Sequence, residues 1–176
     1  MSRERFESPE DRANQTELAR DLRRTWGWIF RDLSASNSHY NLDYFATAPG
    51  SSQGCAWVEV KVRHHKFGTF PTIMLSAGKW IEGCRASRET GLPFVLFFRF
   101  TDGVWQYVYD PKHVVSPLTV KLGLVNPQQP LVTFEWGGRT TNDQDEADVE
   151  PTAMIPVALW KKVELAPPEE PTSHPF

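Results

Sequence analysis

The pattern of apolar positions predicts a helix near the start of the chain. Ser8-Pro9-Glu10-Asp11 has the composition of a helix N-terminus, with serine as the N-cap, proline at the first helical position and acids in the first turn. Apolar side chains then recur at helical spacing, at Leu18, Leu22, Trp26 and as far as Leu33. Gly27 offers an alternative, because a glycine there can end the helix and leave Trp28 to Asp32 for a short strand.

Cys55 to Arg63 is the clearest predicted strand, because apolar and polar residues alternate along it. One face carries Ala56, Val58, Val60 and Val62. The opposite face carries Trp57, Glu59, Lys61 and Arg63. An earlier strand is predicted over Tyr40 to Thr47, and the turn-forming residues 48–54 connect the two strands as a hairpin.

The rest of the chain predicts one more helix and several strands. The helix runs from the capping candidate Thr72 to about Glu89, before a Gly-Leu-Pro stop. A hairpin of strands 94–100 and 104–109 follows it. Two further strands are expected at sheet edges, at Leu131 to Trp136 and at Ala153 to Trp160.

This order of elements predicts an α/β fold, in which a mixed central sheet is flanked by helices. A chain of 176 residues is long enough to bury one substantial core. We therefore expect a single domain over residues 1–165. Residues 166–176 are rich in proline and are expected to form a disordered tail.

The composition is that of an ordinary globular protein, with 40% hydrophobic and 12% aromatic residues. No window approaches the roughly 18 apolar residues that a membrane-spanning helix needs, and the polar start does not resemble a signal peptide. The two cysteines, Cys55 and Cys84, match no zinc-binding or redox spacing. We therefore expect an intracellular, cytoplasmic protein with free thiols and no membrane partner.

The net charge of −3 conceals a division between two parts of the chain. Residues 1–140 carry 17 lysines and arginines against 14 acids, whereas residues 141–176 carry 2 against 8. A mildly basic body is compatible with a nucleic-acid partner. So small an excess is also typical of a generic surface with an acidic end, and charge alone favours that interpretation.

The triplet Glu59-Val60-Lys61 is the strongest candidate for chemistry. Residues i and i+2 of a strand point the same way, about 6.6–7 Å apart, so Glu59 and Lys61 share a face. The short hairpin makes the preceding strand the expected antiparallel neighbour, which places Asp43 beside Glu59. Two close carboxylates repel unless a cation lies between them, and Mg²⁺ is typically held by one or two carboxylates and a substrate phosphate. A nearby lysine then suits the orientation of an attacking water or the neutralisation of the phosphate.

The triplet has a plain alternative interpretation. With 22 acids and 7 lysines, chance alone supplies about one acid-x-lysine match, and Asp110-Pro111-Lys112 is another. The face that carries Glu59 and Lys61 is then simply the solvated side of a half-buried strand.

The order of elements around these residues resembles the PD-(D/E)XK nuclease superfamily, which includes restriction enzymes, phage exonucleases and Holliday-junction resolvases. The resemblance covers about residues 17–100 and implies a restriction-endonuclease-like αβββαβ core. Asn41-Leu42-Asp43 stands where the family has its Pro-Asp segment, with leucine in place of proline. The resemblance implies that Asp43 and Glu59 are metal ligands together with the carbonyl of Val60, and that Lys61 is catalytic. The implied metal is Mg²⁺, for which Mn²⁺ substitutes.

The resemblance also implies further site residues. Many members place a glutamate on the first helix near the metal, and Glu17 is the matching candidate, although a solvated helical acid explains it equally well. Several branches carry a glutamine or lysine on the second helix that faces the metal; Lys79 stands there, with Ser76 one turn away. Contacts to a phosphate backbone are expected from Arg63, His64, His65 and Lys66, for which a solvated turn is the alternative.

The leading functional hypothesis is a Mg²⁺-dependent deoxyribonuclease that hydrolyses phosphodiester bonds. A small core favours structure- or end-directed cleavage in recombination or repair over sequence-specific restriction, which needs more base contacts. Resolvase-like and phage- or prophage-encoded enzymes fit this description, and such enzymes are often homodimers. The alternative is a catalytically inactive scaffold of the same fold that binds nucleic acid or protein.

Overall fold

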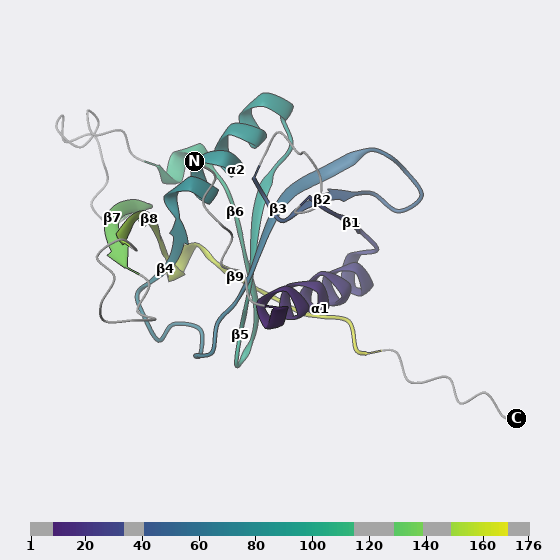
Figure 1. Ribbon diagram of the computed structural model, residues 1–176, viewed down its shortest axis with the longest axis horizontal. Helices are drawn as coiled ribbons and strands as arrows, with labels where there is room; N and C mark the ends of the chain where they lie inside the picture. Colours follow the sequence, from purple (N-terminus) through teal and green to yellow (C-terminus); the bar gives the residue numbers. More distant parts are fainter. Residues whose placement is uncertain (1–8, 34–40, 115–128, 139–148, 169–176) are drawn as a thin grey trace, which may run out of the picture.

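A six-stranded mixed sheet forms the centre of the molecule (Figure 1). The computed structural model describes residues 9–33, 41–114, 129–138 and 149–168. In spatial order, the strands of the sheet are β1 (Ile29–Asp32), β2 (Tyr44–Thr47), β3 (Gly54–Val62), β5 (Phe94–Phe100), β6 (Gly103–Val108) and β9 (Lys161–Val163). Neighbouring strands are antiparallel except β3 and β5, which are parallel.

Helices cover both faces of this sheet, as predicted for an α/β fold. Helix α1 (Pro9–Trp26) packs on one face, where it buries Leu18 and Leu22 against Val58, Val60 and Phe97. Helix α2 (Ala77–Thr90) packs on the other face beside a second sheet. That sheet contains β4 (Thr72–Ser76), β8 (Val149–Pro156) and β7 (Thr133–Gly138), in this order. Two short 3-10 helices, η1 (Pro111–His113) and η3 (Val157–Leu159), complete the described elements.

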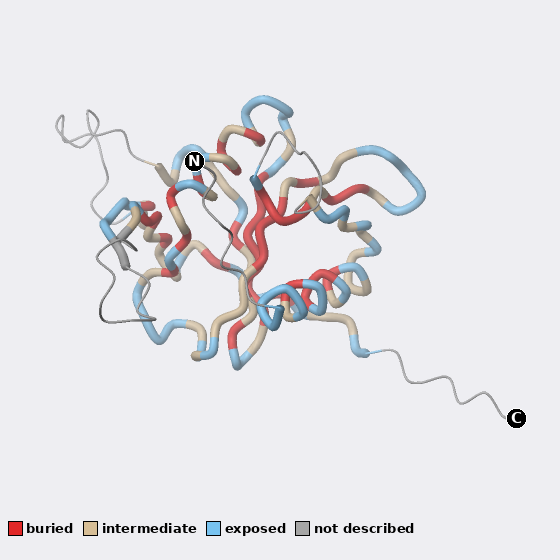
Figure 2. Tube along the Cα trace, in the orientation of Figure 1, coloured by how far each residue is buried: buried red, intermediate tan, exposed pale blue. Residues whose placement is uncertain are grey.

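The burial of side chains follows these layers. Figure 2 shows buried residues along the central strands and on the side of α1 that faces them. Because β3 has neighbours on both edges and layers on both faces, its middle residues Val58, Glu59 and Val60 are completely buried.

Gly27 ends the first helix, which decides between the two alternatives that the sequence left open. It adopts a positive φ of 71°, and its N–H donates to the carbonyl of Arg23 at 2.7 Å. A Cβ at this position would lie 3.1 Å from Pro49 Cγ. Glycine avoids both the backbone strain and the contact, so the chain leaves α1 and enters β1.

The second helix begins five residues later than predicted, at Ala77 rather than Thr72. Residues 72–76 form β4, which pairs with β8, and the burial of Ile73 and Leu75 alternates with the exposure of Met74. The helical spacing of Met74 and Ile81 predicts that both side chains pack in the core, which is wrong, since they are 50% and 57% exposed. A core position is also the expectation for Trp80, and Trp80 is buried.

The predicted edge strands near 131–136 and 153–160 belong to the second sheet and not to the central one. The strand that borders β6 at the edge of the central sheet is β9, which the sequence pattern did not reveal. The described chain stays in contact with α1 beyond residue 165, because Ala166 N–H donates to Thr25 Oγ1 at 3.0 Å. The remainder of the predicted tail, 169–176, lies outside the described residues.

The fold is therefore a single α/β domain with an αβββαβ core, in which β4 is inserted between β3 and α2. Cys55 and Cys84 are free thiols. Within the ranges given above, neither helix has the length and apolar character needed to cross a bilayer.

Candidate active site

Asp43 lies directly before β2, on the edge that faces β3. The pairing of Tyr44 with Val58, extended by one residue, sets Asp43 opposite Glu59. Its carboxylate is buried, and Oδ2 accepts a hydrogen bond from the N–H of Val60 at 3.0 Å. The side chain thus replaces a backbone partner that β2, which begins only at Tyr44, does not supply.

Glu59 lies in the middle of β3 and points to the α2 side of the sheet. Its parallel neighbour on β5 is Leu96, whose side chain belongs to the core on that side. Glu59 is completely buried, with 0% exposure. The alternative of a solvated strand face is therefore wrong at this position, because α2 and the second sheet cover it.

Two lysines complete the cluster. Lys79, in the first turn of α2, places Nζ 3.0 Å from Asp43 Oδ1 and 2.9 Å from Glu59 Oε2. Lys61 lies two residues beyond Glu59 on the same face, with Nζ 3.3 Å from Glu59 Oε1 and 26% of its side chain exposed. The structure thus brings Asp43, Glu59, Lys61 and Lys79 together.

Electrostatics at the cluster are dominated by burial. Burial, reinforced by the nearby charge of Asp43, raises the pKa of Glu59 from 4.5 to about 7, although Lys61 and Lys79 act in the opposite direction. For Lys79, burial lowers the pKa, but the attraction of Glu59 and Asp43 outweighs it, so the pKa is raised. The two ammonium groups therefore do not fully compensate the buried Glu59 carboxylate, and more positive charge would stabilise its ionised form.

The residues present fit a divalent cation with oxygen ligands. Glu59 Oε1 is buried and lies 3.3 Å from Lys61 Nζ in an ion pair, but it accepts no hydrogen bond from the described residues. Among the described residues, no three His, Cys, Asp or Glu side chains are placed to hold a metal ion together, so the ligand side chains found at this site are the two carboxylates. Such a set suits Mg²⁺ or Mn²⁺, which keep several waters and share ligands with a substrate phosphate, and does not suit zinc. That the Val60 carbonyl adds a ligand stays a prediction.

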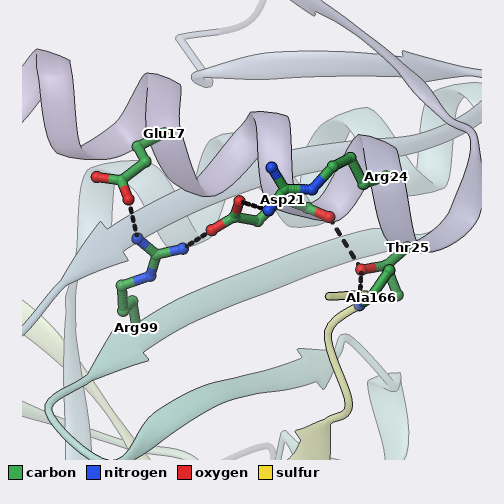
Figure 3. Close-up of polar contacts among 6 residues, drawn as sticks. All are labelled: Glu17, Asp21, Arg24, Thr25, Arg99 and Ala166. Atoms are coloured by element: carbon green, nitrogen blue, oxygen red, sulfur yellow. Dashed lines mark hydrogen bonds and ion pairs between the residues drawn. The ribbon is translucent and has the colours of Figure 1, made fainter. Parts of the chain in front are cut away.

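Glu17 does not lie with the other predicted ligands. Its Oε1 is 3.4 Å from Arg99 Nη1, and Asp21 binds the same guanidinium (Figure 3). Arg99 is the β5 neighbour of Val62, so it lies on the α1 face, whereas Glu59 points to the α2 face. The alternation of side chains along β3 and β5 thus separates Glu17 from the carboxylate pair by the thickness of the sheet.

The predicted substrate-contact residues divide into two groups. Arg63 donates to the Met74 carbonyl at 3.3 Å and lies over the Phe98 ring, and His65 packs edge-on against two phenylalanine rings. These two side chains support the loop that follows β3. His64 and Lys66 are exposed on that loop. Ser76 ends β4 at the N-cap position of α2.

Two features of the structure were not predicted. The first is that Lys79 contacts both carboxylates directly; its place on the second helix predicted only that it faces the metal. The second is the ion-pair cluster of Arg99 with Glu17 and Asp21. A signal for it exists in the sequence, because Arg99 is the single charge in an otherwise apolar strand, Phe94–Phe100.

Comparison with known proteins agrees with this geometry. Residues 1–163 match the model of a family described as "Phage putative PDDEXK endonuclease". No curated protein and no solved structure matches the chain. The match spans the whole αβββαβ core, including Asp43 and Glu59-Val60-Lys61, and confirms the resemblance inferred from those residues. The chain therefore belongs to this family, which is part of the PD-(D/E)XK superfamily.

Proposed function

We propose that the protein is a metal-dependent nuclease that hydrolyses phosphodiester bonds in DNA. The observation that carries the proposal is the convergence of the buried Asp43 and Glu59 carboxylates on the Lys79 ammonium, with Lys61 paired to the other oxygen of Glu59. Membership of a PDDEXK endonuclease family supports the same reaction class. An inactive scaffold would have no need for this costly arrangement of buried charges.

In this proposal Asp43 and Glu59 hold Mg²⁺, or Mn²⁺ as a substitute, and the Val60 carbonyl is the candidate third ligand. The bound ion would supply Lewis-acid activation of a water and stabilisation of charge on the phosphate. Lys61 is the most exposed group of the cluster, so its ammonium is able to meet a phosphate oxygen or orient the attacking water. Burial of Glu59 fixes its position before substrate arrives, which lowers the cost of organising the site.

The proposed substrate is branched or otherwise structured DNA. Beyond the αβββαβ core, the described elements are the small second sheet, strands β6 and β9 and two short 3-10 helices. These additions offer little for reading base edges in a groove, whereas His64 and Lys66 on the loop after β3 suit contacts to the phosphate backbone. A role in recombination or repair of phage DNA follows from such a preference.

A cleavage assay tests the proposal. Labelled single-stranded, duplex, nicked and four-way-junction DNA, together with RNA, is incubated with the protein in Mg²⁺, in Mn²⁺ and in EDTA. We expect DNA cleavage with either metal and none in EDTA, with the junction cut fastest. Lys61→Ala should slow the reaction by at least about a hundredfold, since it removes a charge that stabilises the transition state.

Lys112→Ala is the matched control, because Lys112 belongs to the other acid-x-lysine triplet and is exposed. It should cleave like the wild-type protein. If the wild-type protein leaves every substrate intact in Mn²⁺, the nuclease proposal fails. Binding of the same DNA without cleavage would then establish the scaffold function instead.

A further inference from the structure

Lys79 occupies the point at which the two carboxylates of the site meet. Its Nζ lies 3.0 Å from Asp43 Oδ1 and 2.9 Å from Glu59 Oε2, and its side chain is only 18% exposed. Lys61, in contrast, contacts Glu59 alone and is more exposed. Lys79 is thus the cation that holds the carboxylate pair together in the metal-free protein.

The hydrogen bonds of Asp43 restrict how a second cation is able to enter. Asp43 Oδ2 accepts the N–H of Val60, so Oδ1 is the oxygen of Asp43 that is not tied to this main-chain donor. That oxygen already accepts from Lys79. A divalent ion held by Asp43 and Glu59 would therefore compete with Lys79 for Oδ1, because two cations on one oxygen repel strongly in a buried setting.

From this geometry we propose that Lys79 is the resident counter-cation of the metal-free site, and that a divalent ion binds by displacing Lys79 from Asp43 Oδ1. The inference rests on the proposed metal site at Asp43 and Glu59. Lys79 then has two opposite effects. It stabilises the folded, metal-free protein, because it neutralises a carboxylate pair that otherwise repels. It weakens metal binding, because its attraction to both carboxylates has to be given up.

The position of Lys79 on a helix makes the displacement feasible. Lys79 belongs to the first turn of α2, directly after β4, and reaches the carboxylates through a long flexible side chain. Withdrawal of the ammonium therefore requires rotation of the side chain and no change in the sheet that carries Asp43 and Glu59. Lys79 acts in this scheme as a positioning residue that orders the two ligands before the metal arrives.

Mn²⁺ binding to the purified full-length protein tests the proposal, measured by titration calorimetry and by the change in Tm. Lys79→Met is compared with Lys61→Met, which removes an equal charge from the same site without touching Asp43. In EDTA, the Tm of Lys79→Met should be the lower of the two. We expect its Mn²⁺ Kd to be at least about tenfold tighter than that of the wild-type protein, and the gain for Lys61→Met to be clearly smaller. A purely structural role for Lys79 would lower Tm without tightening Mn²⁺ binding.

Each other outcome overturns the proposal. If Lys79→Met binds Mn²⁺ no more tightly than wild type, or no more tightly than Lys61→Met, displacement is wrong and the nuclease function is unaffected. If neither the wild-type protein nor a variant binds Mn²⁺, the inference and the metal-dependent function both fail. Should Lys79→Met not fold, Lys79→Gln keeps hydrogen-bond donors for both carboxylates without the charge and allows the same comparison.

Discussion

At the residue scale, burial and charge pairing have opposite effects on the protonation of Glu59. Glu59 is fully buried beside a second carboxylate, and both facts favour its protonated form. Two lysines favour the ionised form, but the pKa still rises to about 7. In the metal-free protein, an additional cation beside Glu59 would therefore stabilise the ionised form of its carboxylate.

The pH dependence of stability follows from this shift. A carboxyl whose pKa is raised in the folded state favours folding at pH values below its unfolded pKa of 4.5, and this contribution is lost as pH rises through about 7. Glu59→Gln does not titrate. In EDTA, its free energy of unfolding relative to wild type should therefore increase between pH 5 and pH 8, by on the order of 3 kcal/mol.

Urea denaturation at several pH values measures this difference. Lys79 remains charged across the range, so the loss of one of its partners in Glu59→Gln adds only a constant offset. The exposed Glu164→Gln serves as control and should show no comparable trend. A difference between Glu59→Gln and wild type that is flat from pH 5 to pH 8 would show that Glu59 does not titrate as described.

At the scale of elements, the pattern of apolar and polar residues predicted a helix or strand correctly where that element depends on its own sequence alone. The alternation along β3 and the hairpin of β5 and β6 are properties of short segments, and both were predicted. The start of α2 was predicted wrongly because β4 exists only through its pairing with β8, whose sequence lies more than 70 residues away. The sequence of a short apolar segment such as residues 72–76 is compatible with either a helix or a strand, and pairing with a distant strand decides between them.

The same reason explains which site residues were predictable. Glu59 and Lys61 share a face by local geometry, and Asp43 joins them through a short hairpin. The position of Glu17 depends on which face of the sheet α1 covers, and no spacing within α1 contains that information. The contact of Lys79 with both carboxylates likewise depends on how α2 packs on β3.

The packing of α2 on β5 predicts opposite effects for two glycines of one helix. A Cβ at Gly83 would lie 2.2 Å from the ring of Phe94, which is completely buried. At Gly78, which is exposed, the nearest heavy atom would be Ser76 Oγ at 3.6 Å. Gly83→Ala should therefore destabilise the protein by about 2 kcal/mol or more through overpacking. Gly78→Ala should stabilise it by about 0.5 kcal/mol through helix propensity. Urea denaturation of both variants checks this; equal effects would contradict the described packing.

At the scale of the whole molecule, the central sheet separates a supporting face from a chemical one. On the α1 side, Arg99 pairs with Glu17 and Asp21, and Ala166 donates a hydrogen bond to Thr25. On the α2 side, the carboxylates and lysines gather under the second sheet and α2. We therefore expect substitutions of charge on the α1 face to have little effect on the carboxylate cluster on the α2 face.

Glu17→Gln tests this separation. Because Glu17 lies across the sheet from Glu59, the variant should bind Mn²⁺ and cleave DNA within about twofold of wild type, whereas Asp43→Asn should lose at least about a hundredfold in cleavage rate. A small loss of stability is compatible with the account, since the ion pair with Arg99 is partly exposed. A loss of metal affinity in Glu17→Gln comparable to that of Asp43→Asn would place Glu17 at the metal after all.

Anomalous X-ray diffraction from crystals of the protein grown with Mn²⁺ would locate the metal and identify the residues that hold it. We expect one Mn²⁺ peak bound by carboxylate oxygens of both Asp43 and Glu59, at about the 2.0–2.2 Å typical of such bonds. Ordered Asp43 and Glu59 side chains with no peak between them at saturating Mn²⁺, or a peak held by other residues, would contradict it.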